Sequence, residues 1–314
     1  MKSITKLVYY YFISLLPILI PAAYAQDAGV PVLKTKALFF IKSNFKQPSD
    51  VAVSNDGKVY VLDGVNNRIK IFNPHGIHLS TFGGAGEGSG KFNFPLGIGI
   101  DEQGRVYVAD SGNHRIQIFS PDGKYLSGFN VETGRKDVKP SDPTDIAVNS
   151  SLNKCYVVDN DNHCLLVYDL INKSLIKARG IMGTEKREYR FPFMIDIDSE
   201  GNLYLVEVIN TRVKKVDPEG IYLKSIGGWG VEKGEFYRPK GVAVDSKDRV
   251  FVSDSYLGII QVFDKEGTFL YVLGNENGSI IKFKTPTGLS IDKHMRLYVV
   301  EMLADRVRVL SLKQ

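Results

Sequence analysis

Residues 94–119 read FPLGIGIDEQGRVYVADSGNHRIQIF and contain three short apolar or alternating runs. The runs are residues 96–100, 106–109 and 116–119, and the segments between them are rich in Gly, Asp and Asn. Apolar runs of this length predict β-strands, and turn residues between them predict hairpins. The stretch therefore predicts three consecutive antiparallel strands.

The same template recurs six times along the chain. Each copy starts at a proline, continues as a strand and a turn, and ends a second strand in an acidic residue. The prolines are 47 to 49 residues apart, at Pro48, Pro95, Pro143, Pro192, Pro239 and Pro286. The acids are Asp63, Asp110, Asp159, Glu207, Asp254 and Glu301. A fixed period of this length indicates a repeat architecture.

Third and fourth strands follow in most copies, so each repeat predicts one four-stranded antiparallel blade. Six repeats predict an all-β, six-bladed β-propeller. The sixth repeat stops after its third strand, at residues 306–310, while residues 36–41 form a spare strand before the first repeat. We expect this N-terminal strand to complete the last blade and close the ring, which leaves no open ring edge. Residues 36–314 are then one propeller domain.

The template resembles the NHL repeat, which reads roughly P-x-G-I-A-V-D, then V-Y-V-A-D, then N-x-R-I-x-V-F. The second repeat carries the resemblance best, from Pro95 to Phe119, and the similarity extends over nearly all of residues 36–310. The resemblance implies a six-bladed propeller. It implies no single activity, because related propellers include protein-binding modules, sensor domains, RNA-binding proteins and a few metal-dependent lyases and hydrolases.

The N-terminus has the pattern of a secretory signal peptide over residues 1–25. Lys2 and Lys6 precede an uncharged apolar stretch, and Ala23-Tyr24-Ala25 fits a signal peptidase site. We expect residues 26–35 to be a linker and the mature protein to be periplasmic or secreted, with no stable membrane insertion. The alternative is a membrane anchor, because the uncharged stretch is long enough to span a bilayer.

The composition argues for a folded domain and against several function classes. Charged residues make up 24% and hydrophobic residues 43%, which excludes a disordered chain, a collagen and a polytopic membrane protein. The net charge of +5 is too small for a dedicated nucleic-acid binder. Cys155 and Cys164 lie on paired strands, but Cys155 opposes Tyr168 and Cys164 opposes Asp159. We therefore predict two buried free thiols.

An aromatic residue stands three positions before the proline in five of the six repeats. Because a cofactor box would not occur five times, we interpret these rings as wedges between neighbouring blades. They are Phe45, Phe92, Tyr189, Phe236 and Phe283, with Pro140 in the third repeat. The Gly-rich run at residues 83–90 does not match a phosphate loop. It recurs at residues 227–234, so we expect turns with positive φ there.

Four of the acids that end second strands are followed five residues later by an arginine. We expect surface ion pairs in Asp63/Arg68, Asp110/Arg115, Glu207/Arg212 and Glu301/Arg306. Asp159 and Asp254 lack this arginine. They are therefore candidates for contact with a ligand or another protein.

No nucleophile and base pair, histidine trio or nucleotide loop is found, so no catalytic residue is assigned. Three aspartates on first strands, Asp50, Asp145 and Asp196, are candidate ligands for a Ca or Zn ion in the central channel. The alternative for Asp50 and Asp145 is that they hydrogen-bond neighbouring loop amides at the channel rim. Otherwise we expect no cofactor.

The remaining candidates lie on the rim loops at residues 181–191 and 227–240. Trp229, Tyr237 and Arg238 have the composition of a protein-interface hot spot, and Arg187, Arg190 and Lys240 supply positive charge. We expect an exported, non-enzymatic scaffold that binds a protein, a peptide or a cell-envelope component, and no nucleic acid. The alternative function is a metal-dependent lyase or hydrolase with its cation in the channel.

Overall fold

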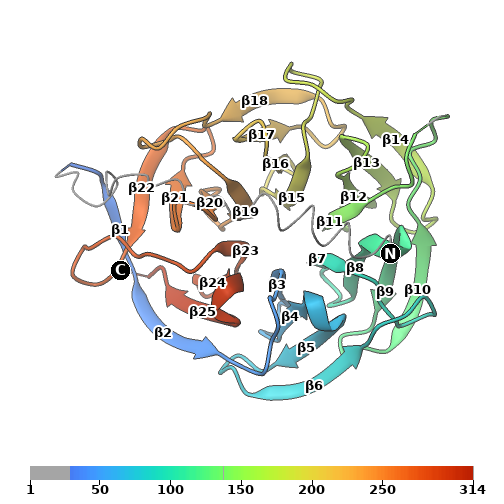
Figure 1. Cartoon of the computed structure of the whole chain (residues 1–314), viewed down its shortest axis with the longest axis horizontal. Coiled ribbons are helices and arrows are strands. Elements are labelled where there is room, and N and C mark those ends of the chain that lie inside the picture. Colours follow the sequence, from blue (N-terminus) through green and yellow to red (C-terminus); the bar gives the residue numbers. More distant parts are fainter. Residues whose placement is uncertain (1–28, 137, 314) are drawn as a thin grey trace. The chain divides into compact units, whose positions relative to one another are not determined.

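Each sequence repeat forms one antiparallel sheet, and the six sheets surround a common axis as the blades of a propeller (Figure 1). The computed structural model describes residues 29–136 and 138–313. The expected signal peptide, residues 1–25, lies outside the described residues. No helix of membrane-spanning length and hydropathy occurs in the part of the chain that the structure describes.

Within each blade the strands follow one another from the axis outward, as the alternating patterns predict. Blade 1 contains β3 (Asp50–Val53), β4 (Val59–Asp63), β5 (Arg68–Phe72) and β6 (His78–Gly83). Blade 2 contains β7 (Pro95–Ile100), β8 (Val106–Asp110), β9 (Arg115–Phe119) and β10 (Tyr125–Asn130). Blade 3 contains β11 (Pro143–Asn149), β12 (Lys154–Asp159), β13 (Cys164–Asp169) and β14 (Leu175–Arg179).

The second half of the chain repeats this order. Blade 4 contains β15 (Pro192–Ile197), β16 (Leu203–Glu207), β17 (Arg212–Val216) and β18 (Tyr222–Ile226). Blade 5 contains β19 (Pro239–Val244), β20 (Val250–Asp254), β21 (Ile259–Phe263) and β22 (Phe269–Gly274). Blade 6 contains β23 (Pro286–Ile291), β24 (Arg296–Glu301) and β25 (Arg306–Ser311). Short 3-10 turns link second and third strands at η2 (Gly64–Asn66), η3 (Ser111–Asn113) and η4 (Met302–Ala304).

The N-terminal strand closes the ring, as predicted. Strand β2 (Lys36–Ile41) pairs antiparallel with β25, with Lys36 opposite Ser311 and Ile41 opposite Val307. Because the first and last segments of the repeat region share blade 6, the ring cannot open without breaking this pairing.

The expected linker of residues 26–35 contains a further strand that was not anticipated. Strand β1 (Val32–Lys34) pairs in parallel with β22 and adds a fifth strand to the outer edge of blade 5. Leu33 is buried against that blade, which supplies the apolar contact that holds so short a strand. Three residues are too few for a clear alternating pattern, so the sequence did not reveal it.

Among the described residues the core contains six large apolar clusters, one between each pair of neighbouring blades, and a small seventh cluster of Phe193, Met194 and Val208. The predicted aromatic wedges are confirmed as members of this core, and each of the five rings is almost completely buried. Phe92 contacts Phe82 and Phe119, at ring-centroid distances of 6.5 and 5.5 Å. Gly83 makes this possible, because its φ is +103° and a Cβ there would lie 2.5 Å from the Phe92 ring.

The two cysteines are buried and free, as predicted. Cys155 opposes Tyr168 and Cys164 opposes Asp159, which is the register expected from the sequence. Burial raises the pKa of the Cys155 thiol to about 12, so this sulfur remains protonated and unreactive at neutral pH.

Substitution of one of the aromatic residues packed between blades should lower the stability of the whole propeller. We expect Phe92→Ala to lower the free energy of unfolding by about 3–5 kcal/mol, because it removes a completely buried ring between two blades. Ile77→Ala, at a side chain that is 62% exposed, should change it by less than about 0.5 kcal/mol. Chemical denaturation of both variants measures the difference, and similar values for the two would contradict the wedge assignment.

Candidate functional site

The acids that end the second strands are buried. The four expected ion pairs form, with N–O distances of 2.5 to 2.8 Å, but every carboxylate is fully buried and only the arginines reach solvent. The expectation of a surface pair is therefore wrong for the acid. The reason is that each carboxylate also accepts a backbone N–H from the incoming loop, such as that of Asn93 on Asp110 at 2.8 Å.

Asp159 and Asp254 lack the arginine found five residues later in the other repeats, but both carboxylates are hydrogen-bonded within the protein. Asp159 accepts the backbone N–H of Asp142 and the side-chain amide of Asn162. Asp254 accepts four backbone N–H groups, including those of Tyr237 and Arg238. Both side chains are fully buried, so they hold their loops in place and are not exposed to a ligand.

The three channel aspartates connect neighbouring blades. Each accepts one N–H from the following residue and a second from the inner strand of the next blade. The second donors are Ile98 to Asp50 at 3.0 Å, Ile195 to Asp145 at 2.9 Å and Val244 to Asp196 at 2.7 Å. For Asp50 and Asp145 this geometry matches the alternative that they hydrogen-bond neighbouring amides, and Asp196 makes the same kind of contact.

The pKa values of the same three aspartates are raised above the ordinary value. Burial raises the pKa of Asp50 to about 7 and that of Asp196 to about 6. Burial and the nearby charge of Asp50 raise the pKa of Asp145. Within residues 29–136 and 138–313, no group of three His, Cys, Asp or Glu side chains that could hold an ion is found.

The rim residues of blade 5 differ in exposure and in the rings that they contact. Trp229 is 76% exposed, whereas Tyr237 stacks on Tyr256 with 4.4 Å between ring centroids. Arg238 lies over the same Tyr256 ring at 5.9 Å, and Lys240 lies over Phe193 at 4.3 Å from the ring centroid. Burial and the charge of Arg238 lower the pKa of Lys240 to about 8.

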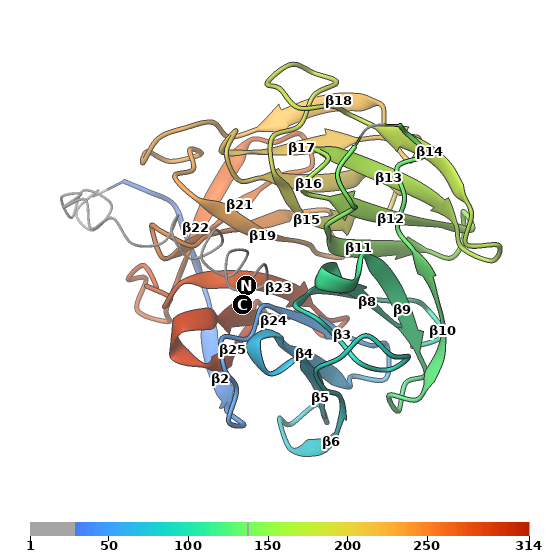
Figure 2. The same ribbon diagram turned by 45° about the vertical axis from the view of Figure 1, so that its right-hand side comes forward.

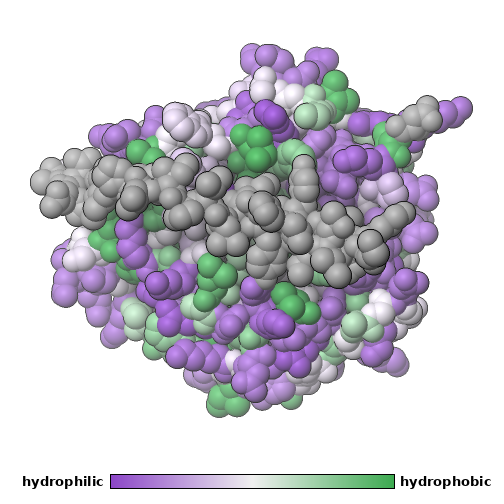
Figure 3. Space-filling model, viewed as in Figure 1, coloured by the Kyte–Doolittle hydropathy of each residue, from purple (hydrophilic) through white to green (hydrophobic). Residues whose placement is uncertain are grey.

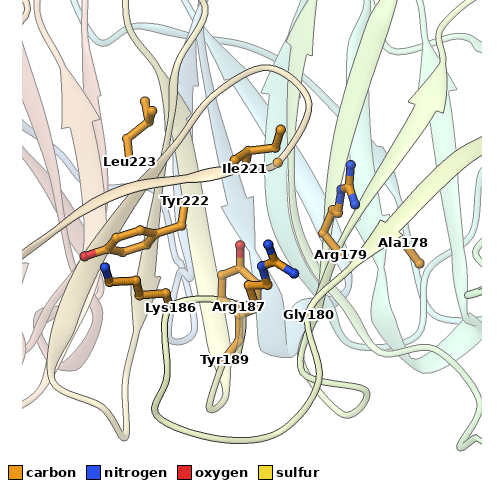
Figure 4. A pocket seen from close by; sticks show the side chains of 10 residues that line it. Ala178, Arg179, Gly180, Lys186, Arg187, Tyr189, Ile221, Tyr222 and Leu223 are labelled. Carbon is orange, nitrogen blue, oxygen red and sulfur yellow. The ribbon is translucent and has the colours of Figure 1, made fainter.

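A cavity of about 610 Å³ lies between blades 3 and 4 on the outer side of the ring. We call it the inter-blade groove. The outer strands β14 and β18 that flank it are neighbours in both ribbon views (Figures 1 and 2). Its lining consists of Ala178, Arg179, Gly180, Lys186, Arg187, Tyr189, Gly220, Ile221, Tyr222 and Leu223 (Figure 4).

The groove brings together few of the residues expected at a binding site. Of the rim candidates, Arg187 lines it, together with Lys186 and Tyr189 from the same loop. Arg190 is exposed but outside the lining, and its backbone N–H donates to Glu207. The hairpin that contributes Ile221, on the other wall, was missed, because its residues look like an ordinary turn and fourth strand.

A comparison between loops would have pointed to this place. The loops that lead into blades 2, 4 and 5 share a backbone bridge, at Ala85↔Phe92, Met182↔Tyr189 and Trp229↔Phe236. In the loop that leads into blade 4 and lines the groove, Ile181 and Arg187 occupy positions that are glycine in both other loops. Side chains have therefore been added where the repeat has none.

Hydrophobic residues on the face viewed in Figure 3 lie in separate small groups among hydrophilic ones. The largest exposed apolar side chains near the groove are Ile181, Met182 and Ile221, each more than half exposed. A local concentration of this kind is typical of a binding surface.

Comparison with known proteins identifies the repeat and the fold. The NHL repeat model matches residues 45–72, 92–119 and 141–168. No curated protein sequence matches the chain.

Several solved structures share the propeller. Virginiamycin B lyase from Staphylococcus aureus with Quinupristin has a TM-score of 0.61 at 16% identity, covering 86% of this chain and 82% of that one. A gluconolactonase from Xanthomonas campestris has a TM-score of 0.65 at 14% identity, covering 91% and 98%. Hydrazine synthase from Kuenenia stuttgartiensis has a TM-score of 0.59 at 11% identity, covering 86% and 96%. Identities this low show the fold alone.

The raised pKa of Asp196 predicts a pH-dependent stability. Because its pKa in the folded protein lies above the ordinary value of about 3.9, the proton stabilises the fold, and this contribution is lost as the pH rises through about 6. Wild-type protein should therefore lose stability relative to Asp196→Asn between about pH 4 and pH 8. Denaturation curves across this range measure the difference. Asp122→Asn, at a carboxylate that is 88% exposed, is the control, and parallel curves for wild type and Asp196→Asn would refute the prediction.

Proposed function

This chain is an NHL-repeat β-propeller, and we propose that it is an exported, non-enzymatic binding module that recognises a protein, a peptide or a cell-envelope component. NHL repeats on a propeller fold support a binding or scaffold role. The observation that carries the proposal is the inter-blade groove, where exposed apolar side chains and unpaired cations lie on a rigid ring.

The groove is large enough to hold part of a ligand. Its volume of about 610 Å³ lies within the range of ligand-binding cavities. Ile221 and Leu223 are 54% and 45% exposed, so a partner that covers them removes apolar surface from water. The walls come from two sheets whose positions are fixed by the ring, so little ordering cost opposes binding.

Export is proposed from the signal pattern of residues 1–25, and this proposal implies a partner in the periplasm or outside the cell. The modest net charge of +5 supports a protein or envelope partner over nucleic acid. The channel aspartates use their oxygens on backbone N–H groups, which supports a structural role for them. A stoichiometric metal that is lost in Asp196→Ala would instead favour the enzymatic alternative.

Affinity capture from an envelope extract tests the proposal. We expect the wild-type ring to retain specific proteins or envelope material, and Ile221→Ser with Leu223→Ser to lose most of it, because the apolar wall is removed. The comparison variant is Trp229→Ala with Arg238→Ala, on the rim of blade 5. Retention by the groove variant and loss by the rim variant would move the site to blade 5, and no specific retention by wild type would refute the proposed function.

A further inference from the structure

The charged side chains that line the inter-blade groove are all positive. Three of its lining residues are cationic, Arg179, Lys186 and Arg187, and none is acidic. Among the described residues, no ion pair involves any of these three side chains. Arg179 donates to the backbone carbonyl of Glu219 at 3.0 Å, and Lys186 lies 5.7 Å from the centroid of the Tyr222 ring. Figure 4 shows Lys186 and Arg187 side by side below the hairpin of blade 4.

Two acids next to the lining residues, Glu188 and Glu219, make contacts of their own, and a third, Glu185, is exposed beside Lys186. Glu188 accepts the backbone N–H groups of Thr184 and Glu185 with the same carboxylate oxygen, so it stabilises its own loop. Glu219 pairs with Lys154 and Lys177. Within the described residues neither carboxylate forms an ion pair with Arg179, Lys186 or Arg187, so an anionic ligand would not displace an ion pair there.

A fourth cation lies behind the lining. Lys214 is completely buried, with its Nζ 4.2 Å from the centroid of the Tyr189 ring and 6.0 Å from that of Tyr222. Its one ion pair is with Glu207, at 3.5 Å, and that carboxylate is shared with Arg212. Lys214 therefore places a further cation behind Tyr189 and Tyr222, with Glu207 as its ion-pair partner.

The groove also has aliphatic lining residues. Ile221 and Leu223 project from the hairpin that leads into β18, and Ala178 lines the groove from β14 (Figure 4). Both strands are the outer edges of their sheets, with backbone groups on one side unpaired in the sheets. On blade 5 the corresponding edge already binds an added strand, β1. An extended peptide can use such an edge, and a carbohydrate or a nucleic acid gains less from the exposed aliphatic side chains.

We propose that the inter-blade groove binds an extended peptide segment in which acidic residues alternate with aliphatic ones. The inference rests on the proposed binding function and specifies its partner. Acidic side chains of the peptide pair with Lys186 and Arg187, and aliphatic side chains pack against Ile221 and Leu223. An alternating pattern suits the site because successive side chains of an extended segment point in opposite directions.

Fluorescence anisotropy with synthetic peptides tests this specificity. The probe is a labelled peptide of alternating glutamate and leucine. One comparison peptide replaces every glutamate with lysine, a second replaces every leucine with serine, and a third ligand is an oligosaccharide of uronic acids. We expect the glutamate–leucine peptide to bind at least about tenfold more tightly than the other three, and its affinity to fall as salt screens the charges.

Matched variants locate the site. Lys186→Glu with Arg187→Glu should weaken the glutamate–leucine peptide at least about tenfold and should favour the lysine–leucine peptide instead. The control is Lys233→Glu, because Lys233 occupies the position of Lys186 in the equivalent loop one blade further on. This variant should bind as wild type does. Circular dichroism and melting curves establish that each variant is folded.

The outcomes separate the two proposals. Equal affinity for the glutamate and lysine peptides, no reversal in the double variant, or preferential binding of the uronic acid oligosaccharide would overturn the peptide assignment. If envelope material is still captured through Ile221 and Leu223 in that case, the proposed binding function stands and only the partner class is wrong. If neither capture nor peptide binding occurs, both fail.

Discussion

The ring depends on one repeated interaction, the buried carboxylate at the end of each second strand. In every repeat this side chain accepts a backbone N–H from the loop that enters the first strand of the same blade. A buried carboxylate is stable only when its oxygens are hydrogen-bonded. The contact therefore fixes both the end of the second strand and the path by which the chain arrives from the preceding blade.

This constraint also explains how the aromatic residues between the blades are held in position. The donor N–H belongs to the residue directly after the aromatic ring, as with Asn93 after Phe92. Holding that N–H holds the ring in the space between two blades, where it joins the apolar cluster. Polar and apolar contacts are thus coupled at adjacent residues. Where the ring is missing, in the third repeat, Asp159 still makes the polar contact with Asp142.

Because these contacts hold the ring together, the residues of the connecting loops and outer strands can differ between blades. The groove arises where one loop departs from the repeat, with Ile181 and Arg187 in place of glycines, and faces a hairpin with exposed Ile221. The inner wall differs as well, because Asp50, Asp145 and Asp196 replace small or apolar residues found in other repeats. There the change reinforces the ring, since each carboxylate binds the N–H of the next inner strand.

Local patterns were enough to establish the six blades, the closing strand at Lys36–Ile41, the buried aromatic rings and the register that keeps Cys155 from Cys164. These features follow from alternation and period, which depend only on neighbours along the chain. The roles of Asp159 and Asp254 and the residues of the groove were decided by the tertiary structure. The carboxylate of Asp254 is fully hydrogen-bonded because the chain folds back and presents four backbone N–H groups to it. The groove exists because β14 and β18 come together from different repeats. Distances between blades depend on packing across the ring, and no local pattern encodes them.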